Sequence, residues 1–164
     1  ADGSVSQSDV PLEVSGLVDI VTIAAGGGFS LALESDGTLW TWGSNASGQL
    51  GTGSSDTSSA VPQAVGLAGV ESIGAGGSHA LALLTDGTLW AWGNNFCGQL
   101  GNDTFTESGT PVQVLDLTAV LSIAAGACHS LALASDGTVY GWGDSSYGQL
   151  GFDSWSPQPV AYPE

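Results

Sequence analysis

The chain contains no lysine, no arginine and no methionine among its 164 residues, and all 16 of its charged side chains are acidic. Without Lys or Arg there is no P-loop lysine, no arginine finger, no Schiff-base lysine and no guanidinium clamp on phosphate. Nucleic-acid affinity depends on basic side chains that displace counterions, whereas the formal net charge here is -16. We therefore expect no nucleic-acid partner.

Long apolar runs are also missing. No run approaches the roughly 18 residues that span a membrane, and an acidic surface is repelled by anionic lipid, so we expect no membrane partner. The sequence starts at Ala1 and shows no secretory signal, so any such signal has been removed or lies outside this sequence. An acidic, Ser-, Thr- and Gly-rich surface favours an extracellular or secreted location, with a cytoplasmic one still open.

What is present is a repeat with a period of 50 residues. Residues 24–51, 74–101 and 124–151 are identical at 14 of 28 positions, and each copy ends in GQLG. A fixed period of this length indicates a repeat architecture. With 42% hydrophobic residues, the chain is expected to form one repeat domain over 1–164, with units at roughly 15–65, 66–114 and 115–160.

Each unit has the pattern of short strands separated by turn residues. Residues 29–34 alternate in polarity, and Asp36-Gly37 predicts a two-residue type I′ hairpin turn. The next strand carries packing residues on both faces, so it needs a sheet above and below. A proline-led strand such as Pro62 to Val65 suits a sheet edge. The sequence therefore predicts an all-β fold of three four-stranded antiparallel β-propeller blades.

The proline-led segment occurs four times, once more than three blades require. Three units of three strands and four such segments make 13 strands, so either Pro11 to Val14 or Pro157 to Val160 is surplus. An open arc of three blades also leaves two apolar faces bare. We expect an incomplete ring that is closed by a second copy or by further chain, and we favour self-association.

The blocks AAGGGFSLAL, DGTLWTWG and SGQLG, with their later copies, resemble the regulator of chromosome condensation repeat family. The resemblance implies blades of about 50 residues, usually seven to a ring, and a protein-binding platform. The eponymous member acts in nucleotide exchange on chromatin, which relies on basic residues missing here, so that activity is not carried over. Secreted β-lactamase inhibitors with this repeat suit an acidic chain better.

Residues at recurring positions have structural explanations. Tryptophans at one repeat position favour packing between blades, and Asp-Gly turn chemistry explains the recurring aspartates better than a calcium or acid-base site. His79 and His129 occupy the position that Phe29 fills in the first copy, which indicates packing. We therefore expect no catalytic residue, no metal site and no cofactor. The structural set is Trp42, Trp92, Trp142, Asp36, Asp86 and Asp136.

Function is expected where the three copies disagree, because loops on a rigid scaffold are free to vary. The loops of the second and third copies place aromatic residues beside acidic ones, a composition typical of protein-binding hot spots. The sequence predicts a non-enzymatic protein-protein interaction module whose partner has a basic surface. The alternatives are a structural or adhesive extracellular module and an enzyme-inhibitor propeller. The binding candidates are Phe96, Phe105, Tyr147, Phe152, Trp155, Asp103, Glu107, Asp144 and Asp153.

The two cysteines occupy positions that the repeat does not require to be cysteine. Cys97 precedes the second GQLG, and Cys128 opens a strand of the third copy. In a radial stack these positions could approach each other at one end of the ring. Both a Cys97 to Cys128 disulfide and two free buried thiols remain open.

Overall fold

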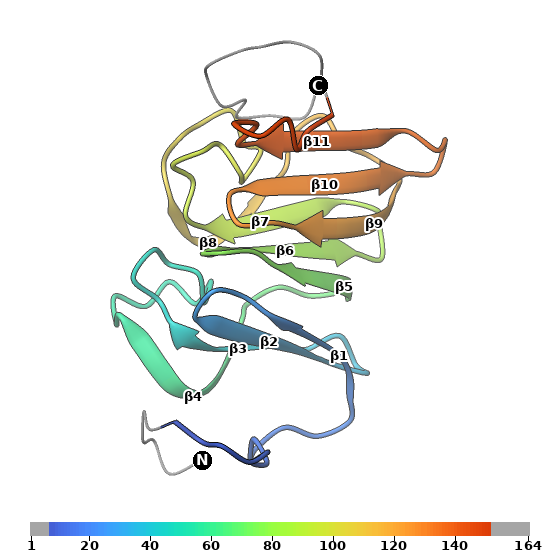
Figure 1. Ribbon diagram of the computed structural model, residues 1–164. Helices are drawn as coiled ribbons and strands as arrows, with labels where there is room; N and C mark the ends of the chain where they lie inside the picture. Colours follow the sequence, from blue (N-terminus) through green and yellow to red (C-terminus); the bar gives the residue numbers. More distant parts are fainter. Residues whose placement is uncertain (1–6, 152–164) are drawn as a thin grey trace.

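The computed structural model describes residues 7–151, which form three antiparallel β-sheets and no helix. Each sheet is a meander whose strands lie in chain order. The sheets follow one another along the molecule without closing a ring, so that β1 and β11 lie near opposite ends (Figure 1). This is an open arc of propeller blades, and the predicted fold class is confirmed.

The first blade contains β1 (Ile20–Ala25), β2 (Phe29–Glu34), β3 (Leu39–Ser44) and β4 (Ser58–Ala64). The second contains β5 (Val70–Ala75), β6 (His79–Leu84), β7 (Leu89–Gly93) and β8 (Ser108–Gln113). The third contains β9 (Val120–Ala125), β10 (His129–Ala134) and β11 (Val139–Gly143). Of the two other proline-led segments, Pro11 to Val14 is described and irregular, and Pro157 to Val160 lies outside the described residues.

The Asp-Gly hairpins differ in detail from the type I′ turn that the sequence suggests. Gly37 N–H donates to the Glu34 carbonyl at 3.0 Å, and the glycine alone is left-handed, with φ +88°. Asp36 keeps a negative φ because its Oδ1 accepts the Thr38 N–H at 2.9 Å. The result is a type I turn followed by a left-handed glycine. That backbone hydrogen bond, first of all, holds the pKa of Asp36 below its ordinary value.

The core lies between the blades rather than within one sheet. Large side chains of one blade, such as Leu31 and Leu33, pack with small ones of the next, such as Ala80 and Ala82. The second and third blades share an equivalent apolar cluster. The inner strands of the second blade are therefore covered on both faces, which explains why they are hydrophobic on both sides.

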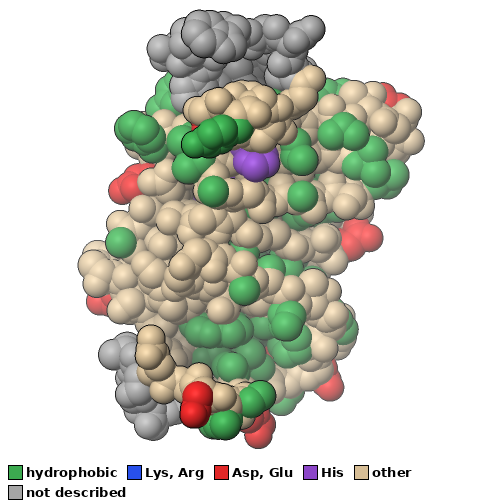
Figure 2. Space-filling model, viewed as in Figure 1, with side chains coloured by type: hydrophobic (Ala, Val, Ile, Leu, Met, Phe, Trp, Pro, Cys, Tyr) green, Lys and Arg blue, Asp and Glu red, His purple; other side chains and the backbone are tan. Residues whose placement is uncertain are grey.

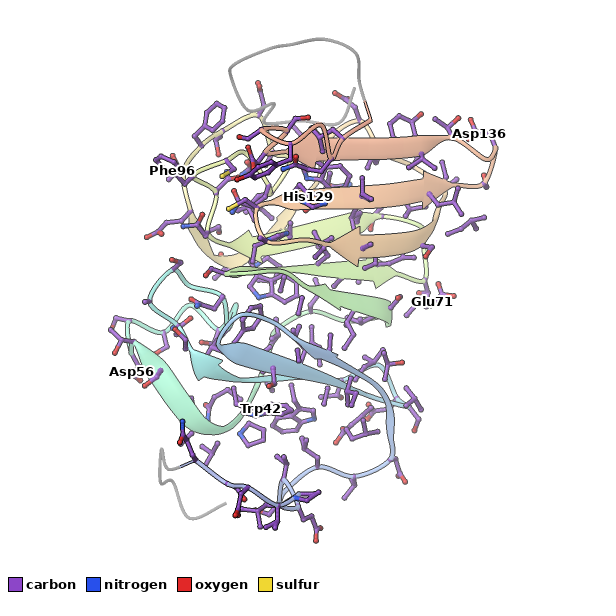
Figure 3. All side chains as sticks on the ribbon, viewed as in Figure 1. Trp42, Asp56, Glu71, Phe96, His129 and Asp136 are labelled. Atoms are coloured by element: carbon purple, nitrogen blue, oxygen red, sulfur yellow. The ribbon has the colours of Figure 1, made fainter. Side chains whose placement is uncertain are left out.

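The tryptophan position connects each blade to the one before it. Trp92 Nε1 donates to the Gln49 carbonyl at 3.0 Å, and Trp142 Nε1 donates to the Gln99 carbonyl at 2.9 Å. Both indoles are fully buried. Trp42 is only partly buried, because no blade of the described chain precedes it, and it lies on the side of the first sheet away from the second (Figure 3).

The turns between the first two strands of each blade also make contacts between blades. Gly27 N–H donates to the Gly76 carbonyl, and Gly77 N–H donates to the Gly126 carbonyl. A Cβ atom on Gly27 would lie 2.4 Å from the Gly77 oxygen, so the approach of the two backbones requires glycine there.

In the described part of the chain there is no helix that could cross a bilayer.

Candidate interaction surface

The loops after β7 and β11 begin with the same rigid turn. Gln99 Oε1 accepts the Cys97 N–H at 2.9 Å, and its Nε2 donates to Asn94 Oδ1 at 2.9 Å. Gln149 makes the equivalent bonds to Tyr147 N–H and Asp144 Oδ2. With its backbone fixed in this way, each turn presents an aromatic side chain to solvent. Phe96 is 82% exposed and Tyr147 is 94% exposed.

The longer loop of the second blade is also held from inside. Asn95 is fully buried, and its Nδ2 donates to the carbonyls of Thr104 at 2.8 Å and Thr106 at 3.1 Å. Between them, Phe105 projects outward and is 53% exposed. The acidic side chains that flank it, Asp103 and Glu107, are exposed as well. The loop therefore presents one aromatic and two carboxylates on a fixed backbone.

Asp144 has a different environment from the other acidic candidates. It is partly buried, and its carboxylate accepts hydrogen bonds from Ser146 N–H at 3.1 Å and Gln149 Nε2 at 2.9 Å. The side-chain hydrogen bond from Ser146 contributes most to holding the pKa of Asp144 below its ordinary value. Asp144 thus remains ionised and braces its own turn. The remaining candidates, Phe152, Asp153 and Trp155, lie outside the described residues.

Sequence reasoning missed the two buried asparagines that hold these loops. Asn45 does in the first blade what Asn95 does in the second, donating to the Asp56 carbonyl at 2.7 Å and accepting the Leu50 N–H at 3.0 Å. The available signal was their spacing of 50 residues, which matches the repeat. The third copy has Ser145 at this position, whose shorter side chain cannot span the same loop.

The two cysteines are brought together at the joint between the second and third blades, as free thiols. Two sulfur atoms, the only ones in the chain, lie close to each other in Figure 3. Burial first, then a hydrogen bond with Cys128 and the charge of Asp144, raises the pKa of Cys97 to about 12. A thiol with so high a pKa carries very little thiolate at neutral pH.

We expect Cys97 to react with iodoacetamide at pH 8 about 1000-fold more slowly in the folded chain than in urea, because the thiolate is the reacting species. Mass spectrometry of chymotryptic peptides over time measures this rate, since a chain without Lys or Arg gives no tryptic peptides. The same chain in urea is the control. Equal labelling rates in the two conditions would show that the thiol is not protected.

His79 is fully buried at the same joint. Ser130 Oγ donates to the Gln99 carbonyl at 2.9 Å, so the 3.0 Å contact to His79 Nε2 is a bond that the imidazole donates. Nδ1 is buried without a partner. Burial, and secondarily the charge of His129, lowers the pKa of His79 to about 4, so the ring is neutral at pH 7. This imidazole belongs to the packing between blades.

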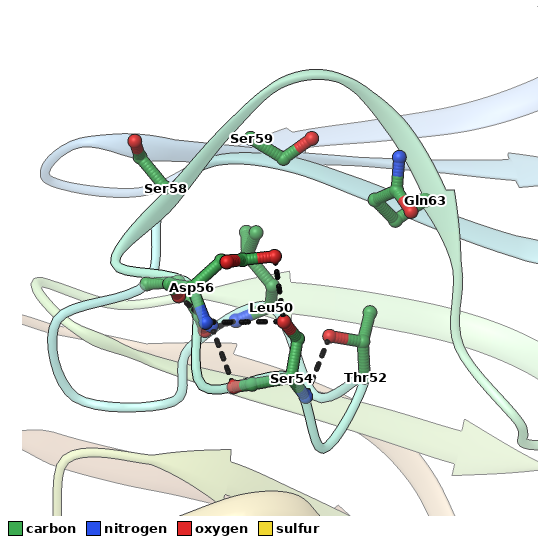
Figure 4. A pocket seen from close by; sticks show the side chains of 8 residues that line it. Leu50, Thr52, Ser54, Asp56, Ser58, Ser59 and Gln63 are labelled. Carbon is green, nitrogen blue, oxygen red and sulfur yellow. Dashed lines mark hydrogen bonds between the residues drawn. The ribbon is translucent and has the colours of Figure 1, made fainter.

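A small polar cavity of about 120 Å³ lies beside the first blade's loop (Figure 4). Its polar groups bond to one another, since Ser54 Oγ donates to Asp56 Oδ2 at 3.0 Å and accepts the Asp56 N–H at 3.1 Å. We assign no ligand to it. Within residues 7–151, no three His, Cys, Asp or Glu side chains gather as metal ligands.

The chain resembles solved structures along most of its length. It is 27% identical to yeast RCC1 (Prp20) bound to Kap60, with a TM-score of 0.82, covering 90% of this chain and 37% of that one. Prp20p from Saccharomyces cerevisiae, a protein with binding properties to Gsp1p and histones, is 28% identical, with a TM-score of 0.80 and coverages of 90% and 38%. Human WBSCR16 is 31% identical, with a TM-score of 0.77 and coverages of 88% and 37%.

The chain thus spans little more than a third of the length of these relatives. No curated protein sequence matches it. The family model described as the regulator of chromosome condensation (RCC1) repeat matches residues 20–49, 70–99 and 120–149, and a second model of that description matches 36–83, 86–133 and 136–164. These matches fall on the three blades and cover more than half of the sequence, so the chain belongs to the RCC1 repeat family.

Proposed function

We propose that the chain is a non-enzymatic protein-interaction module, with a binding surface formed by the turns and loops after β7 and β11. The observation that carries this proposal is the exposure of Phe96 and Tyr147 on turns whose backbones are fixed by hydrogen bonds. A rigid, exposed aromatic loses little conformational entropy when a partner covers it, and it brings a large apolar area to the contact. Phe105 adds a third aromatic on the second blade.

The charge of the chain indicates the chemistry of the partner. Acidic side chains flank the aromatics, and the chain has no Lys or Arg to neutralise them, so its long-range field attracts positively charged surfaces. The similar protein Prp20p has binding properties to Gsp1p and histones. A basic protein surface is therefore the partner class that we propose, with the aromatics as anchors.

Purified core histones serve as a basic protein probe for this proposal. In biolayer interferometry, the association rate should fall by about tenfold or more between 50 and 300 mM NaCl, because salt screens steering between opposite charges. The double variant Phe96→Ser, Tyr147→Ser should weaken binding by roughly 30-fold or more, since removing two anchors costs on the order of 2 kcal/mol.

Leu121→Ser is the matched control. Leu121 is 62% exposed and lies on β9. Its neighbour Val120 pairs with Ala134, beside the Asp136 hairpin, so Leu121 lies away from the loops after β7 and β11. Its replacement should leave binding unchanged. Binding that depends on salt but is indifferent to the loss of both aromatics would reveal charge attraction alone and would overturn the proposed surface.

A further inference from the structure

The segment before the first blade has the local conformation of an outer strand but belongs to none of the three sheets. Ser8 Oγ donates to the Val10 carbonyl at 2.7 Å, directly before Pro11. Ser59 in β4 and Ser108 in β8 each donate to the carbonyl two residues later at the same 2.7 Å, and a proline again follows. Residues 8–14 are therefore shaped like the fourth strand of a blade that the described chain does not contain.

The exposed fractions of the valines show which face of this segment is not packed against other residues. Val14 is 40% exposed, whereas Val65 and Val114, which occupy its position after the other two outer strands, are 5% and 1% exposed. Val10 is 57% exposed, but its equivalent Val61 is still 43% exposed in an assembled blade. Docking onto a blade would thus bury Val14 and leave Val10 in solvent.

The edge of β11 that pairs with no described strand is the matching acceptor. In the first two blades the strand at this position pairs with a fourth strand, through Gly43 with Ser59 and Gly93 with Ser108. Among the described residues β11 pairs only with β10. In the register of the other blades, Gly143 would pair with Ser8. An exposed strand edge is a template for the addition of a strand.

The chain's own candidate for this edge, Pro157 to Val160, is connected differently from the outer strands of the other blades. Five residues separate Gly151 from Pro157, against ten between Gly51 and Pro62. Ser145 also replaces the asparagine that braces that connection in the first and second blades. The third copy therefore has a shorter connection to its proline-led segment and no asparagine at the position that braces this connection in the other two copies.

The two bare faces of the arc complement each other. At the second joint His79 of one blade meets Ser130 of the next, whereas the equivalent positions at the first joint hold Phe29 and Ala80 in an apolar cluster. The outward faces carry His129 and Ser30, which is the polar combination of the second joint. A blade ending in Phe would instead need Ala opposite it. His129 and Ser30 are therefore a compatible pair for a contact between the two outward faces.

Apolar and hydrogen-bonding groups at the two ends also match. Ile23 is 75% exposed on the first blade, although its equivalent Ile73 is 8% exposed, and Val139 on the third is 62% exposed where Leu89 is fully buried. Apolar side chains gather over the first blade, toward the end that carries the N-terminal segment (Figure 2). The Gln149 carbonyl stands where Gln49 and Gln99 accept an indole N–H, and Trp42 is the indole at this repeat position that has no such acceptor among residues 7–151.

We propose that two copies of the chain join head to tail in a closed six-bladed ring, with Ser8 to Val14 of each copy forming the fourth strand on β11 of the other. Both unlike faces of each copy are then covered, which is the condition for a head-to-tail contact to close instead of growing. Trp42 Nε1 donates to the Gln149 carbonyl of the partner copy, and Ser30 meets the partner copy's His129.

One position makes the joint between copies looser than the internal ones. Ala127 stands where Gly27 and Gly77 approach the next blade, and a Cβ atom at those glycines would lie 2.4 and 2.6 Å from a carbonyl oxygen. The neighbouring turn must therefore shift to accommodate the methyl group. The dimer is expected to dissociate on dilution, and Ala127→Gly should strengthen it by several-fold.

Sedimentation equilibrium of the 164-residue chain tests the proposal, with an expected mass of twice 16.3 kDa. Val14→Asp should weaken dimerisation by about 100-fold, because docking would bury an unpaired carboxylate. Val10→Asp, the same change on the same segment, should alter it by less than about threefold. Circular dichroism checks that both variants keep the fold, as expected for exposed residues outside the sheets.

A chain that stays monomeric at every concentration overturns the proposal and assigns the faces to further blades of a longer chain. Oligomers that keep growing with concentration overturn the closed ring. Equal weakening by both Asp variants attributes association to charge instead of strand docking and also overturns it. For Ala127→Gly, an unchanged or weaker dimer would overturn the assigned contact.

Discussion

Replacement of Trp92 by Ala is expected to lower the free energy of unfolding by about 3–5 kcal/mol. The indole is fully buried in the apolar cluster between the first two blades. Its Nε1 also donates to the Gln49 carbonyl, which would lose this donor. Since small domains are stable by only about 5–15 kcal/mol, this loss would remove a large part of the total. Urea unfolding followed by circular dichroism measures it.

Trp42→Ala is the matched comparison, because Trp42 occupies the same position one blade earlier. It is only partly buried, and no blade of the described chain covers it, so the expected cost is about 1–2 kcal/mol in dilute solution, where copies are separate. The difference between the two substitutions isolates the contribution of a blade-to-blade joint. Equal costs would mean that the tryptophan stabilises its own blade and not the joint.

The blades themselves could be predicted from the sequence because their signals are local and repeated. The alternation in residues 29–34 places β2 at Phe29–Glu34, and the recurring tryptophan indicates packing between blades. The hairpin geometry could not be predicted in the same way, since Asp-Gly is compatible with two turns. Which one forms depends on the bond that Asp36 accepts from Thr38 N–H, a detail of the folded turn.

The candidate surface was accessible to sequence reasoning only in part. Variable loops pointed to Phe96, Phe105 and Tyr147, whose exposure the structure then supplies. That the backbones beneath them are fixed depends on contacts such as those of Asn95 with Thr104 and Thr106, which join residues nine and eleven apart. The amino-acid composition of the loops does not predict those contacts. Asp144, predicted as a binding residue from its charge and its loop, also braces its own turn, which the sequence did not indicate.

Acidification from pH 6.5 to pH 4 is expected to cost about 3 kcal/mol of stability through His79 alone. The folded chain holds its pKa at about 4, whereas an unfolded histidine titrates near the ordinary value of 6.5. Between these two values the unfolded state binds the additional proton, so unfolding becomes more favourable as the pH falls. The free energy of unfolding is therefore unaffected by His79 above pH 6.5, and it falls as the pH decreases from 6.5 to 4.

The first joint shows which residues would remove this sensitivity of the stability to pH. At the first joint the positions of His79 and Ser130 are held by Phe29 and Ala80, both buried in an apolar cluster. The double variant His79→Phe, Ser130→Ala therefore converts the second joint into the first without introducing an untried packing. Ser130→Ala alone keeps the histidine and is the control, so it should retain the loss between pH 6.5 and pH 4.

The informative quantity is the difference in unfolding free energy between each variant and the original chain at each pH. Neutralising the 16 carboxylates changes self-repulsion in all three proteins alike, and this effect cancels in the difference. The hydrogen bonds from Thr38 hold the pKa of Asp36 below its ordinary value in all three proteins, so its titration cancels in the difference as well. For the double variant the difference should shift in its favour by about 3 kcal/mol from pH 6.5 to pH 4. A difference that stays flat would show that the buried imidazole is not the acid-sensitive group of this joint.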